Sequence, residues 1–203
     1  KDWNKKLEEI VAEAPNRDIV ILVGVPAWIQ LSIEMILKKY NLKNIHELWP
    51  NLSFFGHGGV SFEPYKKGFE RLLGKPLTYI ETYLASEGFL AYQALPDRKS
   101  MRLVLNTGIF FEFIPFTSSN FDEEGTLVAN PQTLAYGELE EGKEYALLIS
   151  TCAGAWRYLI GDVIRLVSKE EAEISITGRT KHFLSLCGEH LSVENMNKAI
   201  ELA

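Results

Sequence analysis

Five segments at the start of the chain alternate between strand-like and helix-like patterns, and this order constrains the fold more than any other feature. Residues 18–23 are a short, nearly continuous apolar run, which is typical of a strand buried on both faces. Pro26 then suits the first turn of a helix whose apolar residues recur up to Asn41. The strand-like runs lie at 18–23, 52–55 and 77–82, and the helical patterns at 26–41 and 62–73. This alternation predicts an α/β fold, with a parallel sheet flanked by helices.

After about residue 88 the pattern changes to short β-like runs separated by turn signals. The runs lie at 89–94, 101–105, 109–115, 126–128, 134–139, 145–150, 158–167 and 173–177. Asn106-Thr107-Gly108 is placed for a hairpin between the second and third runs, so no helix is expected over 101–115. We predict an antiparallel, barrel-like β subdomain over 89–179, after an α/β subdomain over 1–88. A hinge and the start of a small domain, with a helical pattern over 191–202, follow at 180–203.

Composition excludes several classes of protein. The chain is 46% hydrophobic with a net charge of −6, which is globular and shows no basic stripe for nucleic acid or an anionic membrane. No apolar stretch is long enough to span a bilayer. The two cysteines, Cys152 and Cys187, fit reduced thiols in a cytoplasmic protein, and the four histidines lack zinc-ligand spacing. The chain opens at Lys1 without Met and stops inside a helical pattern, so we expect a segment of a longer protein.

Two places after the predicted parallel strands could bind a ligand. Gly56-His57-Gly58-Gly59 is a glycine turn where backbone can approach a ligand closely, although a close-packed turn without a ligand gives the same pattern. The third strand ends in Tyr83-Leu84-Ala85-Ser86-Glu87, which gathers an aromatic ring, a hydroxyl and a carboxylate. Such a group could stack a base, hold a phosphate and bind Mg²⁺. The alternative is a helix cap at Ser86 or Glu87.

Asp162 is a third candidate, because it interrupts an apolar β run between Ile160 and Val163. A buried carboxylate without a partner is costly, so Asp162 needs a hydrogen-bond donor. Ribose hydroxyls would serve, and so would Arg157 or Arg165. The run after it ends in Thr177-Gly178-Arg179.

Taken in order, these motifs resemble the adenylate-forming superfamily of acyl-CoA synthetases, adenylation domains and luciferases. Within it the chain is most similar to the auxin-responsive Gretchen Hagen family of acyl-acid amido synthetases and its bacterial relatives. The residues that carry the resemblance are Trp49-Pro50-Asn51-Leu52, Phe111-Glu112-Phe113-Ile114-Pro115, Ala153 to Tyr158 with Gly161-Asp162-Val163, and Leu184-Ser185 with Gly188-Glu189-His190-Leu191-Ser192. The resemblance covers nearly the whole chain and implies an incomplete adenylate-forming architecture.

The resemblance implies a ligase that uses ATP and Mg²⁺. A small-molecule carboxylic acid would attack the α-phosphate of ATP, and an amine, usually of an amino acid, would then take the acyl group from the adenylate. By position, Gly58 and Gly59 would line the adenine pocket and Tyr83 would lie against the base. Ser86 would hydrogen-bond the α-phosphate and Glu87 would bind Mg²⁺, as the two catalytic residues. Asp162 would hold the ribose hydroxyls, and Arg179 would approach the ribose or a phosphate near the hinge.

The chain departs from the family pattern in two places. Leu84-Ala85 stand where Gly-Ser is common, and the Ser/Thr/Gly-rich phosphate loop is absent, so the segment alone is expected to be inactive. Two other functions stay open. One is an acyl-CoA or carrier-protein ligase of the same superfamily, and the other is a non-catalytic nucleotide-binding or scaffold relative.

Overall fold

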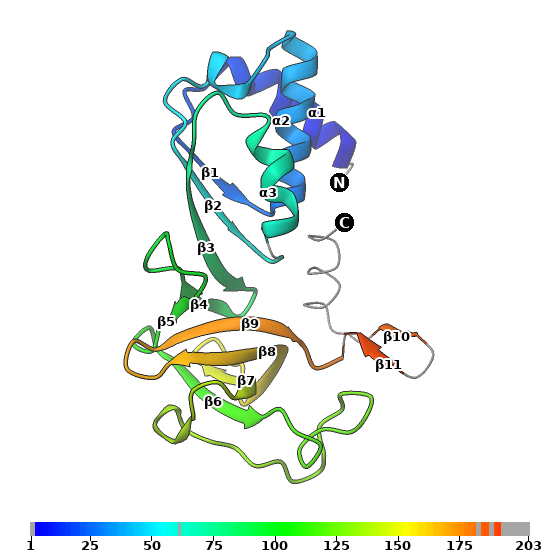
Figure 1. Cartoon of the computed structure of the whole chain (residues 1–203), viewed down its shortest axis with the longest axis vertical. Coiled ribbons are helices and arrows are strands. Elements are labelled where there is room, and N and C mark those ends of the chain that lie inside the picture. Colours follow the sequence, from blue (N-terminus) through cyan, green and yellow to red (C-terminus); the bar gives the residue numbers. More distant parts are fainter. Residues whose placement is uncertain (1–2, 61, 182–183, 187–188, 192–203) are drawn as a thin grey trace. The chain divides into compact units, whose positions relative to one another are not determined.

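The computed structural model describes residues 3–60, 62–181, 184–186 and 189–191. It divides the chain into a first unit, Lys1–Thr82, and a second unit, Tyr83–Ala203 (Figure 1). Each unit is described by itself below. The subdomain boundaries expected at residues 88 and 179 stay predictions.

Three parallel strands form the sheet of the first unit, as the alternating pattern predicts. Its elements are α1 (Trp3–Glu13), β1 (Ile21–Gly24), α2 (Pro26–Tyr40), β2 (Phe54–Gly58), α3 (Glu63–Glu70) and β3 (Thr78–Ala85), with short 3-10 helices at Ala14–Asn16 and Ile45–Glu47. β1 pairs with β2 and β2 with β3, both in parallel. Helix α2 begins at Pro26 and ends at Asn41, whose left-handed backbone (φ 52°) stops it.

Strand β1 differs from the expected strand that is buried on both faces. Ile21 and Val23 are 58% and 70% exposed, whereas Leu22 packs against the core of the unit. Val11 of α1, Ile33 of α2 and Phe69 of α3 all belong to that same core. The three helices therefore bury one face of β1, and the residues of the first unit leave the other uncovered (Figure 1).

The expected glycine turn at 56–59 begins later than the sequence indicates. Gly56, His57 and Gly58 belong to β2, and only Gly59 has a positive φ, of 82°. Gly58 pairs with Thr82, and a Cβ on Gly58 would lie 2.3 Å from the Thr82 carbonyl oxygen. Position 58 therefore requires glycine because two strands approach closely there.

The second unit is mainly antiparallel β structure, as predicted, and no helix lies over 101–115. Its strands are β4 (Gly88–Tyr92), β5 (Met101–Leu103), β6 (Ile109–Pro115), β7 (Glu144–Thr151), β8 (Tyr158–Ser168) and β9 (Glu173–Arg179), followed by the antiparallel pair β10 (Leu184–Leu186) and β11 (Glu189–Leu191). Hydrogen bonds link them in the order β4-β5-β9-β8-β7-β6. The runs expected at 126–128 and 134–139 form only isolated bridges, at Leu127 and Leu134, and a 3-10 helix, Tyr136–Glu138. The helix expected over 191–202 lies outside the described residues from 192 on.

The hairpin expected at Asn106-Thr107-Gly108 is wrong. Gly108 has the positive φ of a turn, 80°, but β5 pairs with β4 and β9, whereas β6 pairs with β7 over its whole length. Phe111 and Phe113 of β6 enter the same core as Leu147 and Ile149 of β7. A turn signal is local, whereas this long cross-strand match decides which strand β6 pairs with.

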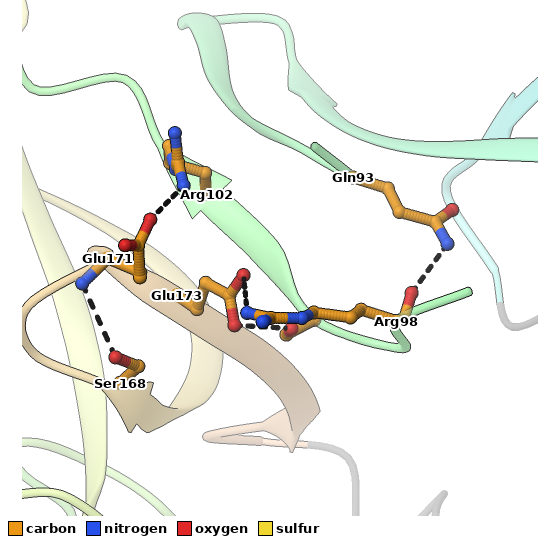
Figure 2. A network of polar contacts seen from close by, with 7 residues as sticks. Gln93, Arg98, Arg102, Ser168, Glu171 and Glu173 are labelled. Atoms are coloured by element: carbon orange, nitrogen blue, oxygen red, sulfur yellow. Dashed lines mark hydrogen bonds and ion pairs between the residues drawn. The ribbon is translucent and has the colours of Figure 1, made fainter. Parts of the chain in front are cut away.

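A polar network ties the segment after β4 to β9 (Figure 2). Glu173 is 3% exposed, and its carboxylate accepts from Arg98 Nη1 and Ser100 Oγ, each at 2.9 Å. Arg102 of β5 pairs with Glu171 close by. The buried carboxylate is thus fully partnered, which is the condition under which its burial is tolerated.

Candidate functional site

Asp162 of β8 lies at the centre of a three-residue cluster in the second unit. Its Oδ2 accepts a hydrogen bond of 2.5 Å from the Tyr83 hydroxyl, and its Oδ1 lies 3.0 Å from Arg179 Nε. Asp162 and Arg179 face each other in the register of β8 and β9. The partner that Asp162 requires is therefore neither Arg157 nor Arg165, which pair with Glu112 and Glu144.

The backbone beside Asp162 holds Arg179 in place. Gly161 has a φ of 89°, and its carbonyl accepts from the Thr180 amide at 2.8 Å. Arg179 Nη2 donates to the Ile160 carbonyl at 3.1 Å. The Asp162 side chain is 18% exposed and that of Arg179 is 49% exposed, so solvent and a ligand can reach the outer edge of this pair.

Tyr83 lies on the inner side of the cluster. It is 6% exposed, and its ring packs in the core of the second unit. Burial, and then the Asp162 carboxylate, raise the pKa of Tyr83 well above its ordinary value, so the hydroxyl stays protonated and donates to Asp162. The structure thus shows Tyr83 orienting a carboxylate, while the adenine contact implied by the resemblance stays a prediction.

Ser86 and Glu87 form the two-residue turn between β3 and β4. The alternative of a helix cap at this place is wrong, because the next element is a strand. Ser86 is exposed and Glu87 is half-buried, so a hydroxyl and a carboxylate lie together in the turn that joins the two strands. Within the described residues no group of three His, Cys, Asp or Glu side chains could hold a metal ion. A metal at Glu87 would need most of its ligands from a substrate or water.

Gly58 and Gly59 belong to the first unit. Each is explained by the local structure: Gly58 approaches Thr82 closely, and Gly59 has a positive φ, as described above. Neither reason excludes a ligand, because a backbone without side chains is also what a planar base can approach. Their role in nucleotide binding stays a prediction.

Sequence reasoning missed two features of these sites. The first is the Asp162–Arg179 pair. The short connection between β8 and β9 indicates an antiparallel pair of strands, and the register of that pair could have predicted that these two residues face each other. The second is His57, which the sequence presents only as one residue of a glycine turn. Its side chain is 5% exposed, and Nδ1 is a buried nitrogen without a hydrogen-bond partner in the described part of the chain. No local pattern signals that arrangement.

Comparison with known proteins finds similarity to the GH3 family. The model of the GH3 family central domain matches residues 102–179, which include Asp162 and Arg179. A probable indole-3-acetic acid-amido synthetase GH3.6 of Oryza sativa subsp. japonica is 26% identical over 78% of this chain and 34% of its own length. A jasmonoyl-L-amino acid synthetase JAR4 of Nicotiana attenuata is 28% identical over 78% of this chain and 28% of its own length. The chain therefore spans about a third of the curated relatives it matches.

Solved structures show the same fold. The acyl acid amido synthetase AtGH3.15, in complex with 2,4-DB, superposes with a TM-score of 0.72 at 16% identity, over 95% of this chain and 42% of that one. A 2-hydroxyisobutyryl-CoA ligase in the postadenylation state superposes with a TM-score of 0.68 at 12% identity, over all of this chain and 42% of that one. The chain thus shares its fold with part of each of these two ligases. None of the described helices is long and apolar enough to cross a membrane.

Proposed function

We propose that this chain belongs to the GH3 family and is part of an acyl-acid amido synthetase. The observation that carries the proposal is the extent of the sequence match. Relatives named as indole-3-acetic acid-amido synthetases align along 78% of the chain, and the residues that match the GH3 central domain include the Asp162–Arg179 pair. Cytoplasmic location is part of the proposal and rests on the cysteine usage.

The reaction would have two steps with ATP as a substrate. A carboxylate oxygen of the acid attacks the α-phosphorus of ATP, an acyl-adenylate forms, and pyrophosphate leaves. The nitrogen of an amine, which we propose is that of an amino acid, then attacks the acyl carbon. The amide forms, AMP leaves, and the amine loses a proton. Charge accumulates around the α-phosphate in the first step, so positioned donors there lower the barrier.

Asp162 is suited to accept from the ribose hydroxyls. The Tyr83 hydroxyl and Arg179 Nε each occupy one of its oxygens, which fixes the carboxylate in one orientation. Each carboxylate oxygen has further lone pairs, so two ribose hydroxyls can still donate to it. Arg179 also carries the positive charge nearest to this point and is half-exposed, which suits a contact with the ribose or a phosphate.

Ser86 and Glu87 are assigned to the phosphates. The Ser86 hydroxyl can donate to the α-phosphate. The Glu87 carboxylate is the ligand type that Mg²⁺ prefers, and Mg²⁺ is commonly held by one or two carboxylates together with substrate phosphates. The single carboxylate in this turn fits such a site. When bound, Mg²⁺ would supply positive charge to the phosphates.

Gly58 and Gly59 of the first unit are assigned to the adenine. The assignment is supported by their place at the carboxyl end of a parallel strand, where α/β sheets bind ligands. The absence of Cβ atoms lets backbone amide and carbonyl groups approach a planar base. For Tyr83, an adenine contact is proposed from its place in the motif alone.

The test is ATP–pyrophosphate exchange by the complete protein over a panel of small carboxylic acids. We expect exchange that depends on one class of acid, and an amide product when amino acids are added. Thioester formation with coenzyme A, and no amide, would favour the acyl-CoA ligase. If no acid supports exchange while ATP still binds, the protein is a nucleotide-binding relative without turnover.

A further inference from the structure

His57 is a buried residue whose contacts are made by its ring and not by its Nδ1 nitrogen. It lies in β2, directly before Gly58 and Gly59, and its Nδ1 has no hydrogen-bond partner among the described residues. A buried nitrogen without a partner destabilises a fold, whereas a phenyl ring at the same place would not carry that cost. The nitrogen therefore gives no reason for the burial of this side chain, and the contacts of the ring are the feature to consider.

The imidazole ring of His57 contacts Phe62, which follows Gly58 and Gly59 in the sequence. Its centroid lies 4.6 Å from that of Phe62, with an interplanar angle of 33°. Phe62 is the N-cap residue of α3, is buried, and also makes an edge contact with Phe55 at 5.6 Å. The ring contact thus joins the end of β2 to the beginning of α3, and Gly58 and Gly59 lie between them in the sequence.

The backbone around His57 is fixed as well. The His57 carbonyl accepts a hydrogen bond of 3.1 Å from Thr82 Oγ1. The next residue, Gly58, approaches the Thr82 carbonyl so closely that a Cβ there would lie 2.3 Å away. A displacement of His57 would therefore move the Gly58 backbone with it.

Two acidic residues lie on the elements next to His57. Glu63 of α3 interacts with it electrostatically, and Glu81 of β3 is its register partner, so it shares the same face of the sheet. Burial lowers the pKa of His57 to about 4, although Glu63 opposes this. The ring is consequently neutral at neutral pH, and a neutral ring can remain among the rings of Phe55 and Phe62.

We propose that His57 is a positioning residue, whose neutral ring packs on Phe62 and so holds the Gly58–Gly59 backbone in the shape that the nucleotide meets. The proposal rests on the proposed function, because it takes these two glycines as nucleotide-binding. His57 acts through the glycines and touches no reacting atom itself.

The test compares three variants of the complete protein. His57→Ala removes the ring, His57→Phe keeps a ring without the unpartnered nitrogen, and Ile36→Val disturbs the same core away from the glycines. We expect His57→Ala to raise the KM for ATP roughly 10- to 100-fold, the scale for a small misplacement of a binding group. The kcat at saturating ATP and the KM for the acid should change less than about twofold. His57→Phe should recover the ATP KM, and Ile36→Val should leave it unchanged.

Two results would overturn the proposal. If His57→Phe is as impaired as His57→Ala, the nitrogen matters and the ring contact does not. If His57→Ala changes every kinetic parameter equally, or Ile36→Val behaves like it, the effect is general destabilisation.

Hydrogen exchange at the Gly58 and Gly59 amides gives a readout that needs no turnover. We expect faster exchange in His57→Ala and normal exchange in His57→Phe and Ile36→Val. If the protein activates no acid, the proposed function is wrong. The hydrogen-exchange rates of the Gly58 and Gly59 amides would still show whether His57 holds these glycines in place. Unchanged exchange in His57→Ala would refute that role.

Discussion

Asp162 is the residue on which the nucleotide assignment depends most. In the complete protein, Asp162→Ala should weaken ATP binding by roughly 1–3 kcal/mol, the scale for losing hydrogen bonds to a charged group. The fold should survive, because Arg179 is half-exposed and can be solvated. Isothermal titration calorimetry with ATP measures the change, with Glu144→Ala as the control.

Glu144 of β7 suits that control because it pairs with Arg165 of β8 and not with a residue of the Asp162 cluster. Its loss should leave ATP affinity as it is. Unchanged affinity in Asp162→Ala would instead make Asp162 a structural partner of Arg179 and Tyr83, and the ribose assignment would be wrong.

His57 should also make the first unit sensitive to acid. Its folded-state pKa of about 4 lies below its ordinary value of 6.5, so the unfolded chain binds the proton first as the pH falls. The stability that His57 contributes is therefore complete above pH 6.5 and is lost between there and pH 4. Urea unfolding should show a loss of about 2 kcal/mol between pH 7 and pH 5 that is absent in His57→Phe.

The comparison with His57→Phe is needed because Glu81 acts with the opposite sign. Burial and Glu63 raise the pKa of Glu81, so its contribution to stability grows as the pH falls. Equal acid sensitivity in the wild type and in His57→Phe would show that His57 does not titrate in this way.

At the level of elements, the link between β9 and the segment after β4 depends on one buried carboxylate. Glu173→Gln removes the charge that Arg98 and Ser100 share and should cost about 1–3 kcal/mol of unfolding free energy. Glu171, which pairs with Arg102 nearby, is far more exposed than Glu173, so Glu171→Gln should cost less than about 1 kcal/mol. Chemical denaturation of both variants makes the comparison, and equal costs would argue that the network in Figure 2 does not hold this segment.

At the level of the whole molecule, the 203-residue chain alone should not catalyse ATP–pyrophosphate exchange. ATP carries about four negative charges, and its β- and γ-phosphates need backbone donors and cations. The chain has net charge −6, and no glycine-rich stretch in it is followed by Lys and Ser/Thr. Donors of that kind are worth about 2.7–4 kcal/mol each in a transition state. If the isolated chain catalyses ATP–pyrophosphate exchange at the rate of the complete protein, this prediction is wrong. The proposal that the chain carries only about half of the nucleotide site would then be wrong as well.

The sequence by itself determined which elements form and which residue types could carry chemistry. Apolar runs followed by Pro26 or a glycine predicted β1, α2 and β2 in the right order, because periodicity and turn chemistry act within a few residues. The motifs around Asp162 and Arg179 likewise pointed to the family whose central-domain model matches residues 102–179, since several motifs in a fixed order are specific even when each alone is weak.

Only the tertiary structure decided which of these groups meet. Tyr83 and Asp162 are 79 positions apart and bond through their hydroxyl and carboxylate, while the nearer candidate Arg157 pairs with Glu112 instead. The hairpin expected between β5 and β6 failed for the same reason. Local propensity sets the conformation of a segment, but the partner of a strand or a buried charge depends on strand order and register, which are fixed when the whole core packs.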